Sequence, residues 1–147
     1  MRFWTLCSLS AVALSSFAGV ATAHADPRGL WLADDGAEVR IAPCGKALCG
    51  KIAVTKSPTN PDTGQPWTDM NNLDRQLRDR PLEGVEVLIS MMPDGPGRWS
   101  GELYDTGSGR NLPGHLIEID TKTIRVEGCA GLNGAPPCGG KNLTRAE

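Results

Sequence analysis

Histidine and aromatic side chains are scarce in this chain of 147 residues. It contains two histidines, His24 and His115, and aromatic residues make up 5% of it. His115 is the only histidine beyond the N-terminal stretch, which excludes metal sites built from several imidazoles and favours a structural role for this ring over a catalytic one. Ser90, Ser100 and Ser108 lie outside any G-x-S-x-G nucleophile motif. We therefore predict no catalytic residue, no metal site and no cofactor.

An excess of positive charge is also lacking. The chain has 15 lysines and arginines against 17 acidic residues, a formal net charge of −2. Nucleic-acid-binding proteins carry basic patches that attract phosphate, so we predict no nucleic-acid partner. After the first 25 residues there is no apolar stretch long enough to span a bilayer. The remainder is therefore predicted not to cross a membrane.

The N-terminal stretch has the three zones of a secretory signal peptide. Arg2 supplies a positive charge, an apolar run follows from Leu6 to Val20, and small residues end in Ala23-His24-Ala25. The apolar run is shorter than the roughly 20 residues of a spanning helix. A cut after Ala23 and an uncleaved anchor are the alternatives. The predicted division is a signal peptide over residues 1–25 and a single exported domain over residues 26–147.

Four cysteines lie in the predicted domain, as two pairs that are each close in sequence: Cys44 with Cys49, and Cys129 with Cys138. An even number of cysteines in an exported chain predicts two disulfides. Bridges within each close pair are favoured, and crossed pairing remains open. Zinc is the other alternative, but the spacings C-x4-C and C-x8-C fit common zinc ribbons poorly.

Most of the domain shows the sequence pattern of β-strands. Apolar residues alternate with polar ones in short stretches, as Val39 and Ile41 do with Glu38 and Arg40. Such alternation is typical of strands with one buried face, and the Gly, Pro, Asn and Asp residues between the stretches suit hairpin turns. We predict about eight antiparallel strands, near residues 29–33, 37–43, 48–55, 85–92, 98–104, 110–119, 122–128 and 141–146.

The segment over residues 57–84 breaks this pattern. It contains several loop-forming residues and one plausible helical turn, between Asn72 and Arg80, which Pro81 ends. The segment also holds the densest group of charges, and we regard Arg78 and Arg80 as candidate contacts for an anionic group. A solvated, salt-bridged surface is the alternative for these side chains.

An eight-stranded antiparallel sheet removes its exposed edges when it closes into a barrel. Gly29-Leu30-Trp31 opens the first predicted strand, and Arg145 lies in the last. This resembles the G-x-W start and late arginine of lipocalin-like barrels. The resemblance implies that Trp31 plugs one end of the barrel and that Arg145 packs across its indole as a cation–π pair.

Further motifs extend over most of the predicted domain. They are Gly29-Leu30-Trp31 with Asp34-Asp35-Gly36; Cys44-Gly45 with Leu48-Cys49-Gly50-Lys51-Ile52; Asn72 with Leu77-Arg78-Asp79-Arg80-Pro81-Leu82-Glu83-Gly84; Trp99, Gly101 and Tyr104-Asp105; and Thr144-Arg145. Together they resemble the exported bacterial family of unknown function called DUF2147. The resemblance implies a small periplasmic, lipocalin-like β-barrel without an established enzymatic activity. The chain departs from the family where Asn142-Leu143 replace the usual aromatic residue and in its Gly/Pro-rich segment between Cys129 and Cys138.

The interior of such a barrel either fills with side chains or holds a small ligand. We predict a non-enzymatic periplasmic binding module for a small apolar or amphipathic ligand. The alternative is a structural or protein-interaction module of the cell envelope with a filled barrel. An enzyme dependent on His115 has the least support. The candidate ligand-lining residues are Val85, Val87, Ile89, Trp99, Leu103 and Ile117.

Overall fold

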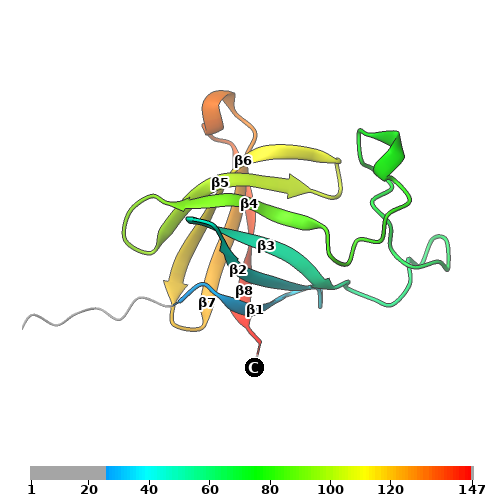
Figure 1. The fold of residues 1–147 in the computed structure, drawn as a ribbon, viewed down its shortest axis with the longest axis horizontal. Coiled ribbons are helices and arrows are strands. Elements are labelled where there is room, and N and C mark those ends of the chain that lie inside the picture. The colour runs from blue at the N-terminus through cyan, green and yellow to red at the C-terminus, as the bar shows by residue number, and fades with distance from the viewer. Residues whose placement is uncertain (1–25, 147) are drawn as a thin grey trace, which may run out of the picture.

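A computed structural model describes residues 26–146, and these residues form a closed antiparallel β-barrel (Figure 1). Each strand pairs with the next along the chain, and the last pairs with the first, placing Trp31 opposite Arg145. The predicted signal peptide lies outside the described residues. The strands in residues 26–146 are β1 (Gly29–Ala33), β2 (Glu38–Cys44), β3 (Ala47–Val54), β4 (Glu86–Pro93), β5 (Arg98–Asp105), β6 (Arg110–Asp120), β7 (Thr123–Cys129) and β8 (Cys138–Arg145).

Two short 3-10 turns complete the secondary structure of residues 26–146: η1 (Arg75–Leu77) and η2 (Leu132–Gly134). In η1, the Asp74 side chain accepts a hydrogen bond from the backbone N–H of Gln76, at 2.9 Å, and so caps the turn. The predicted all-β barrel of about eight strands is thus confirmed; η1 lies where the helical turn was predicted, and η2 is an additional turn. Among the described residues, no helix has the length and apolar character needed to span a membrane.

The barrel interior is packed with apolar side chains. Trp31, Met91, Leu116 and Ile124 have no exposed surface, because strand alternation turns them inward from different sides of the barrel. Trp99 and Leu103 pack against this core and are partly buried. The core consists of Trp31, Ala33, Ile41, Leu88, Met91, Leu116, Ile124, Val126 and Leu143.

Strand β4 changes the phase of its alternation at a β-bulge. The register with β5 shifts between Ile89 and Met92, and Ser90 has a positive φ of 50°. As a result, Leu88 and Met91 both face the interior although they are three residues apart.

Two disulfides close hairpins at opposite ends of the barrel. Cys44 is bonded to Cys49 across the β2–β3 turn, and Cys129 is bonded to Cys138 where β7 leads to β8. This is the pairing that the sequence spacing favours. Because successive turns of an up-and-down barrel alternate between its ends, the two disulfides lie far apart.

The segment between β3 and β4 lies against the outside of the barrel. Figure 1 shows that this segment, with η1, extends beside the turn that joins β5 to β6. Asn71 donates a side-chain hydrogen bond of 3.1 Å to the carbonyl of Thr106 in that turn. A Cβ atom at Gly109 would lie 1.9 Å from the Asn71 carbonyl oxygen, so the backbones approach as closely as a glycine permits. We call residues 57–84 the docked segment.

Candidate functional site

An open groove of about 640 Å³ is lined by residues of the docked segment and of the outer wall of the barrel. This volume lies within the range of small-molecule sites. One side of the groove comes from the docked segment and the other from β4, β5 and the start of β6. Its lining residues are Asn72, Leu73, Leu77, Arg80, Glu86, Ile89, Tyr104, Gly109, Arg110 and Asn111.

A buried carboxylate holds the polar side of this groove together. Asp69 is 1% exposed. Its Oδ1 accepts a hydrogen bond of 2.6 Å from the Tyr104 hydroxyl. Its Oδ2 accepts hydrogen bonds from Asn72 Nδ2, at 2.8 Å, and from Arg80 Nε and Nη2, at 3.0 and 2.7 Å. We call Asp69, Asn72, Arg80 and Tyr104 the Asp69 cluster.

Two ionisable groups of the Asp69 cluster have displaced pKa values. Burial alone would raise the pKa of Asp69, but hydrogen bonds from Tyr104, Asn72 and Arg80 outweigh it and keep this pKa below its ordinary value. Burial, followed by the hydrogen bond to the Asp69 carboxylate, raises the pKa of Tyr104 to about 12. At neutral pH the cluster therefore contains a carboxylate, a neutral phenol and a guanidinium.

The remaining lining gives the groove an apolar part and an exposed arginine, Arg110. Leu73 is 64% exposed and Leu77 37%, although both are large apolar side chains. Ile89 adds an apolar side chain from the barrel wall. Arg110 is exposed and forms no ion pair within residues 26–146. An amphipathic molecule would find complementary surfaces here.

The two candidate anion contacts lie in different positions. Arg80 lines the groove, with two of its nitrogens bonded to Asp69. Arg78 instead donates from Nε to the Asn72 carbonyl, at 2.8 Å, and is not part of the lining. Asp69 was not predicted as a site residue, because nothing in the sequence distinguishes it from a turn-forming aspartate. Tyr104 was missed as well, although it is the only tyrosine in the chain.

The predicted ligand-lining residues do not share one surface. Trp99 and Leu103 pack against the barrel core. Val87, Ile89 and Ile117 lie on the outer face, because their neighbours Leu88 and Leu116 occupy the inward positions. Two of the six candidates, Trp99 and Leu103, thus pack against the core, and the ligand-lining role of the set stays a prediction. The remaining candidate, Val85, is 5% exposed but lies outside the core.

Leu103 fills space rather than bordering it. A Cβ atom at Gly114 would lie 2.9 Å from the Cβ and the backbone nitrogen of Leu103. One at Gly128 would lie 3.0 Å from Leu103 Cδ2. The Leu103 side chain thus occupies the space that side chains at Gly114 and Gly128 would need, and the barrel is closely packed at this level.

Trp31 and Arg145 lie together at one end of the barrel. The Arg145 guanidinium carbon is 4.3 Å from the centre of the Trp31 ring. Trp31 Nε1 donates a hydrogen bond of 2.8 Å to the Pro27 carbonyl, and Arg145 Nη1 donates one of 3.1 Å to that of Arg28. A smaller open cleft of about 310 Å³, bordered by Trp99, lies at this end.

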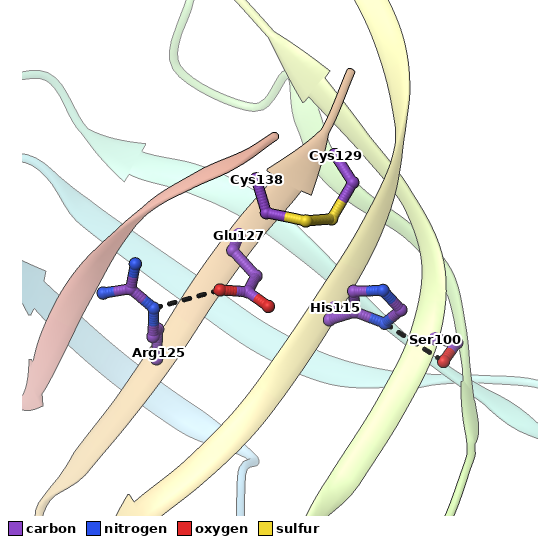
Figure 2. Close-up of a disulfide and its surroundings, with 6 residues drawn as sticks. All are labelled: Ser100, His115, Arg125, Glu127, Cys129 and Cys138. Atoms are coloured by element: carbon purple, nitrogen blue, oxygen red, sulfur yellow. Dashed lines mark hydrogen bonds and ion pairs between the residues drawn. A yellow bond between two sulfur atoms is a disulfide. The ribbon is translucent and has the colours of Figure 1, made fainter. Parts of the chain in front are cut away.

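A second polar cluster lies on the outer wall, away from the groove (Figure 2). Ser100 Oγ is 3.3 Å from His115 Nδ1 and donates a hydrogen bond to Asp94 Oδ2. In a catalytic triad the carboxylate orients the histidine. Here the carboxylate binds the serine instead, which gives acyl transfer no support. Figure 2 also shows Glu127, held by Arg125, beside the Cys129–Cys138 disulfide.

Comparison with known proteins gives a family and a fold. A comparison with curated proteins finds no significant match. Among solved structures, the chain is similar to "Protein HP1028 from the human pathogen Helicobacter pylori", described as belonging to the lipocalin family, with a TM-score of 0.69 and 13% identity over 84% of each chain. The barrel fold is thus lipocalin-like. Residues 29–136 match the model of a family described as "Uncharacterized protein conserved in bacteria (DUF2147)". The matched range ends before the Thr144-Arg145 motif. This chain therefore belongs to the DUF2147 family.

Proposed function

We propose that the protein is an exported binding module for a small amphipathic ligand, and that the groove beside the Asp69 cluster holds this ligand. The observation that carries the proposal is the lining of the groove. Asn72, Arg80 and Tyr104 of the Asp69 cluster supply polar groups to the groove, and the exposed leucines Leu73 and Leu77 supply apolar surface. The close packing of apolar side chains in the barrel core supports a site outside the interior.

The polar side of the groove is arranged before a ligand arrives. The carboxylate of Asp69 holds Arg80 through Nε and Nη2, which leaves Nη1 without a hydrogen bond within residues 26–146. Arg110 supplies a second cation on the barrel side. A ligand carrying a carboxylate or similar anion at one end would bind these donors, while its apolar part covers Leu73 and Leu77.

Export to the bacterial periplasm is part of the proposal. Two disulfides within a small domain suit an oxidising compartment, and the matched family is a bacterial one. The signal-like zones before Ala25 point the same way.

The first test is native mass spectrometry of the mature protein, purified from periplasm without denaturant. We expect a discrete additional mass that organic extraction removes. Protein freed of this ligand is then titrated with dodecanoate. Leu77→Asp should weaken dodecanoate binding at least about tenfold, since it places a charged carboxylate against the apolar chain. Leu132→Asp, which changes a leucine that is 90% exposed and outside the groove, should leave it unchanged. Equal binding by both variants would contradict the groove as the site.

A second candidate function is a protein-interaction module of the cell envelope. Its support is the apolar side chains that the docked segment exposes: Met70 is 50% exposed, and Leu73 and Leu77 are exposed as well. This function predicts no carried ligand and no dodecanoate binding. Instead, a defined envelope protein would co-elute with the wild type and not with Leu77→Asp.

A further inference from the structure

On the outer wall of the barrel, a glutamate lies beside the two cysteines of the second disulfide, and all three side chains are of types that bind metals. The ligand atoms of Glu127, Cys129 and Cys138 all lie within 4.8 Å of one another. Glu127 and Cys129 are two residues apart on β7 and so share its outer face, and Cys138 is directly opposite Cys129 on β8. The close-up in Figure 2 shows the Glu127 side chain next to the disulfide.

These three side chains suit zinc once the two sulfurs are thiolates. Zinc binds thiolate sulfur at about 2.3 Å and carboxylate oxygen at about 2.0–2.2 Å, so its ligand atoms lie roughly 3.5 Å apart. The atoms here therefore need only small side-chain movements, including separation of the two sulfurs after reduction. Cys129 is 1% exposed while Cys138 is exposed, so the site is covered on one side and accessible from the other.

Arg125 prepares Glu127 for this role. Its Nε donates a hydrogen bond of 3.1 Å to Glu127 Oε2, and no hydrogen bond to Oε1 is formed within residues 26–146. Hydrogen-bonded carboxylates are typical of metal sites, where the partner orients the ligand. The Arg125 charge also balances the surplus negative charge of two thiolates and one carboxylate around a divalent cation.

We infer that the reduced protein binds one zinc ion through Cys129, Cys138 and Glu127, and that the disulfide is the closed, metal-free form of this site. In the opening step a dithiol reductant transfers two electrons and two protons to the disulfide and becomes a disulfide itself. Zinc then displaces the two thiol protons. Water, or the imidazole of His115, which is directly opposite Glu127 on β6, completes the tetrahedron.

The other disulfide provides the matched control, because no acidic side chain joins Cys44 and Cys49 in a comparable cluster within residues 26–146. Mature protein is reduced with a phosphine, desalted without oxygen and titrated with Zn²⁺, and separately with Co²⁺, whose thiolate charge-transfer band reports sulfur ligands. Wild type and Cys44→Ser/Cys49→Ser should each bind one zinc per chain. Oxidised wild type and Cys129→Ser/Cys138→Ser should bind none.

Glu127→Gln removes the carboxylate ligand and keeps all four cysteines. It therefore distinguishes zinc binding by all three ligands from zinc binding by the two thiolates alone. Its zinc affinity should fall by at least about tenfold, the scale on which metal-site partners act, while its oxidised form keeps both disulfides. Near-UV circular dichroism shows that each variant is folded. The inference is overturned if reduced wild type binds no zinc, if Cys129→Ser/Cys138→Ser binds it as wild type does, or if Glu127→Gln retains full affinity.

Discussion

The barrel interior and the Asp69 cluster bury opposite kinds of side chain. The interior contains apolar side chains from strands all around the barrel, and several of them, such as Trp31 and Leu116, are completely covered. The cluster joins the docked segment to Tyr104 of β5 outside the barrel core and is organised by one carboxylate, Asp69. Many small contacts stabilise the first region, whereas a few charged hydrogen bonds stabilise the second.

This difference separates the folding of the protein from its candidate function. A closed, filled barrel needs only apolar residues at alternating positions. Among residues 26–146, every buried side-chain nitrogen or oxygen has a hydrogen-bond partner, including those of the Asp69 cluster. This cluster lies at the border of the groove. Substitutions in the two regions should therefore lower the free energy of unfolding by different amounts.

The largest effect is expected from Trp31→Ala, which removes the largest fully buried side chain of the barrel. It should lower the free energy of unfolding by about 3–5 kcal/mol, because the loss of burial is added to the cost of a cavity. Trp67→Ala is the matched control in the docked segment, where Trp67 is half-buried and packs against Lys56. It should cost roughly 1–2 kcal/mol. Urea unfolding measures both, and equal losses would contradict the filled core.

Asp69→Asn should lower the free energy of unfolding by about 3 kcal/mol, because it removes the acceptor for Tyr104 and the charge that pairs with Arg80. Asp79→Asn changes an exposed aspartate of the same segment and should alter stability by less than about 0.5 kcal/mol. Urea unfolding again gives the values. A loss as small as that of Asp79→Asn would show that the cluster does not hold the segment.

Gly109→Ala tests the contact between the docked segment and the barrel. Gly109 and Gly45 have nearly equal φ values, +68° and +69°, so alanine meets the same backbone strain at both. The new methyl group would overlap the Asn71 carbonyl at Gly109 and meets nothing within 4 Å at Gly45. Gly109→Ala should therefore cost about 1–3 kcal/mol more than Gly45→Ala. Equal unfolding free energies would contradict the docking.

The smallest effect concerns the pH dependence at alkaline pH. The pKa of Tyr104 is raised to about 12. Its stabilising contribution is therefore complete below the unfolded pKa of about 10 and is lost as the pH rises through the folded value. Wild type should lose stability relative to Tyr104→Phe in this interval. Since the chain has one tyrosine, phenolate absorbance gives its pKa directly. A midpoint near 10 in the folded protein would contradict the buried hydrogen bond to Asp69.

Much of the barrel could be predicted because strand patterning is local. The predicted ranges coincide with the observed strands to within a few residues, except at β8, which begins at Cys138 rather than near residue 141. There, Gly139 and Gly140 pair with β7 through their backbone and carry no apolar signal. The phase of β4 was also missed, since nothing in the alternation marks Ser90 as the site of a bulge.

The Asp69 cluster illustrates why the candidate site was harder to predict. Asp69 and Tyr104 are 35 residues apart in sequence, and Asp69 resembles any loop aspartate. Of the four cluster residues, only Arg80 was predicted as a site residue, because it lies in a dense group of charges. Neither residue type nor spacing indicates that the segment folds back onto β5.

The sequence by itself determined the strand content, the favoured cysteine pairing and the family to which the chain belongs. These features depend on residues that are neighbours in the chain or on short motifs. The tertiary structure alone decided which strand faces point inward, which apolar side chains pack together in the interior, and that Asp69 meets Tyr104 beside a groove. Barrel closure and loop docking bring distant residues together, and the energies of those contacts leave no periodic trace in the sequence.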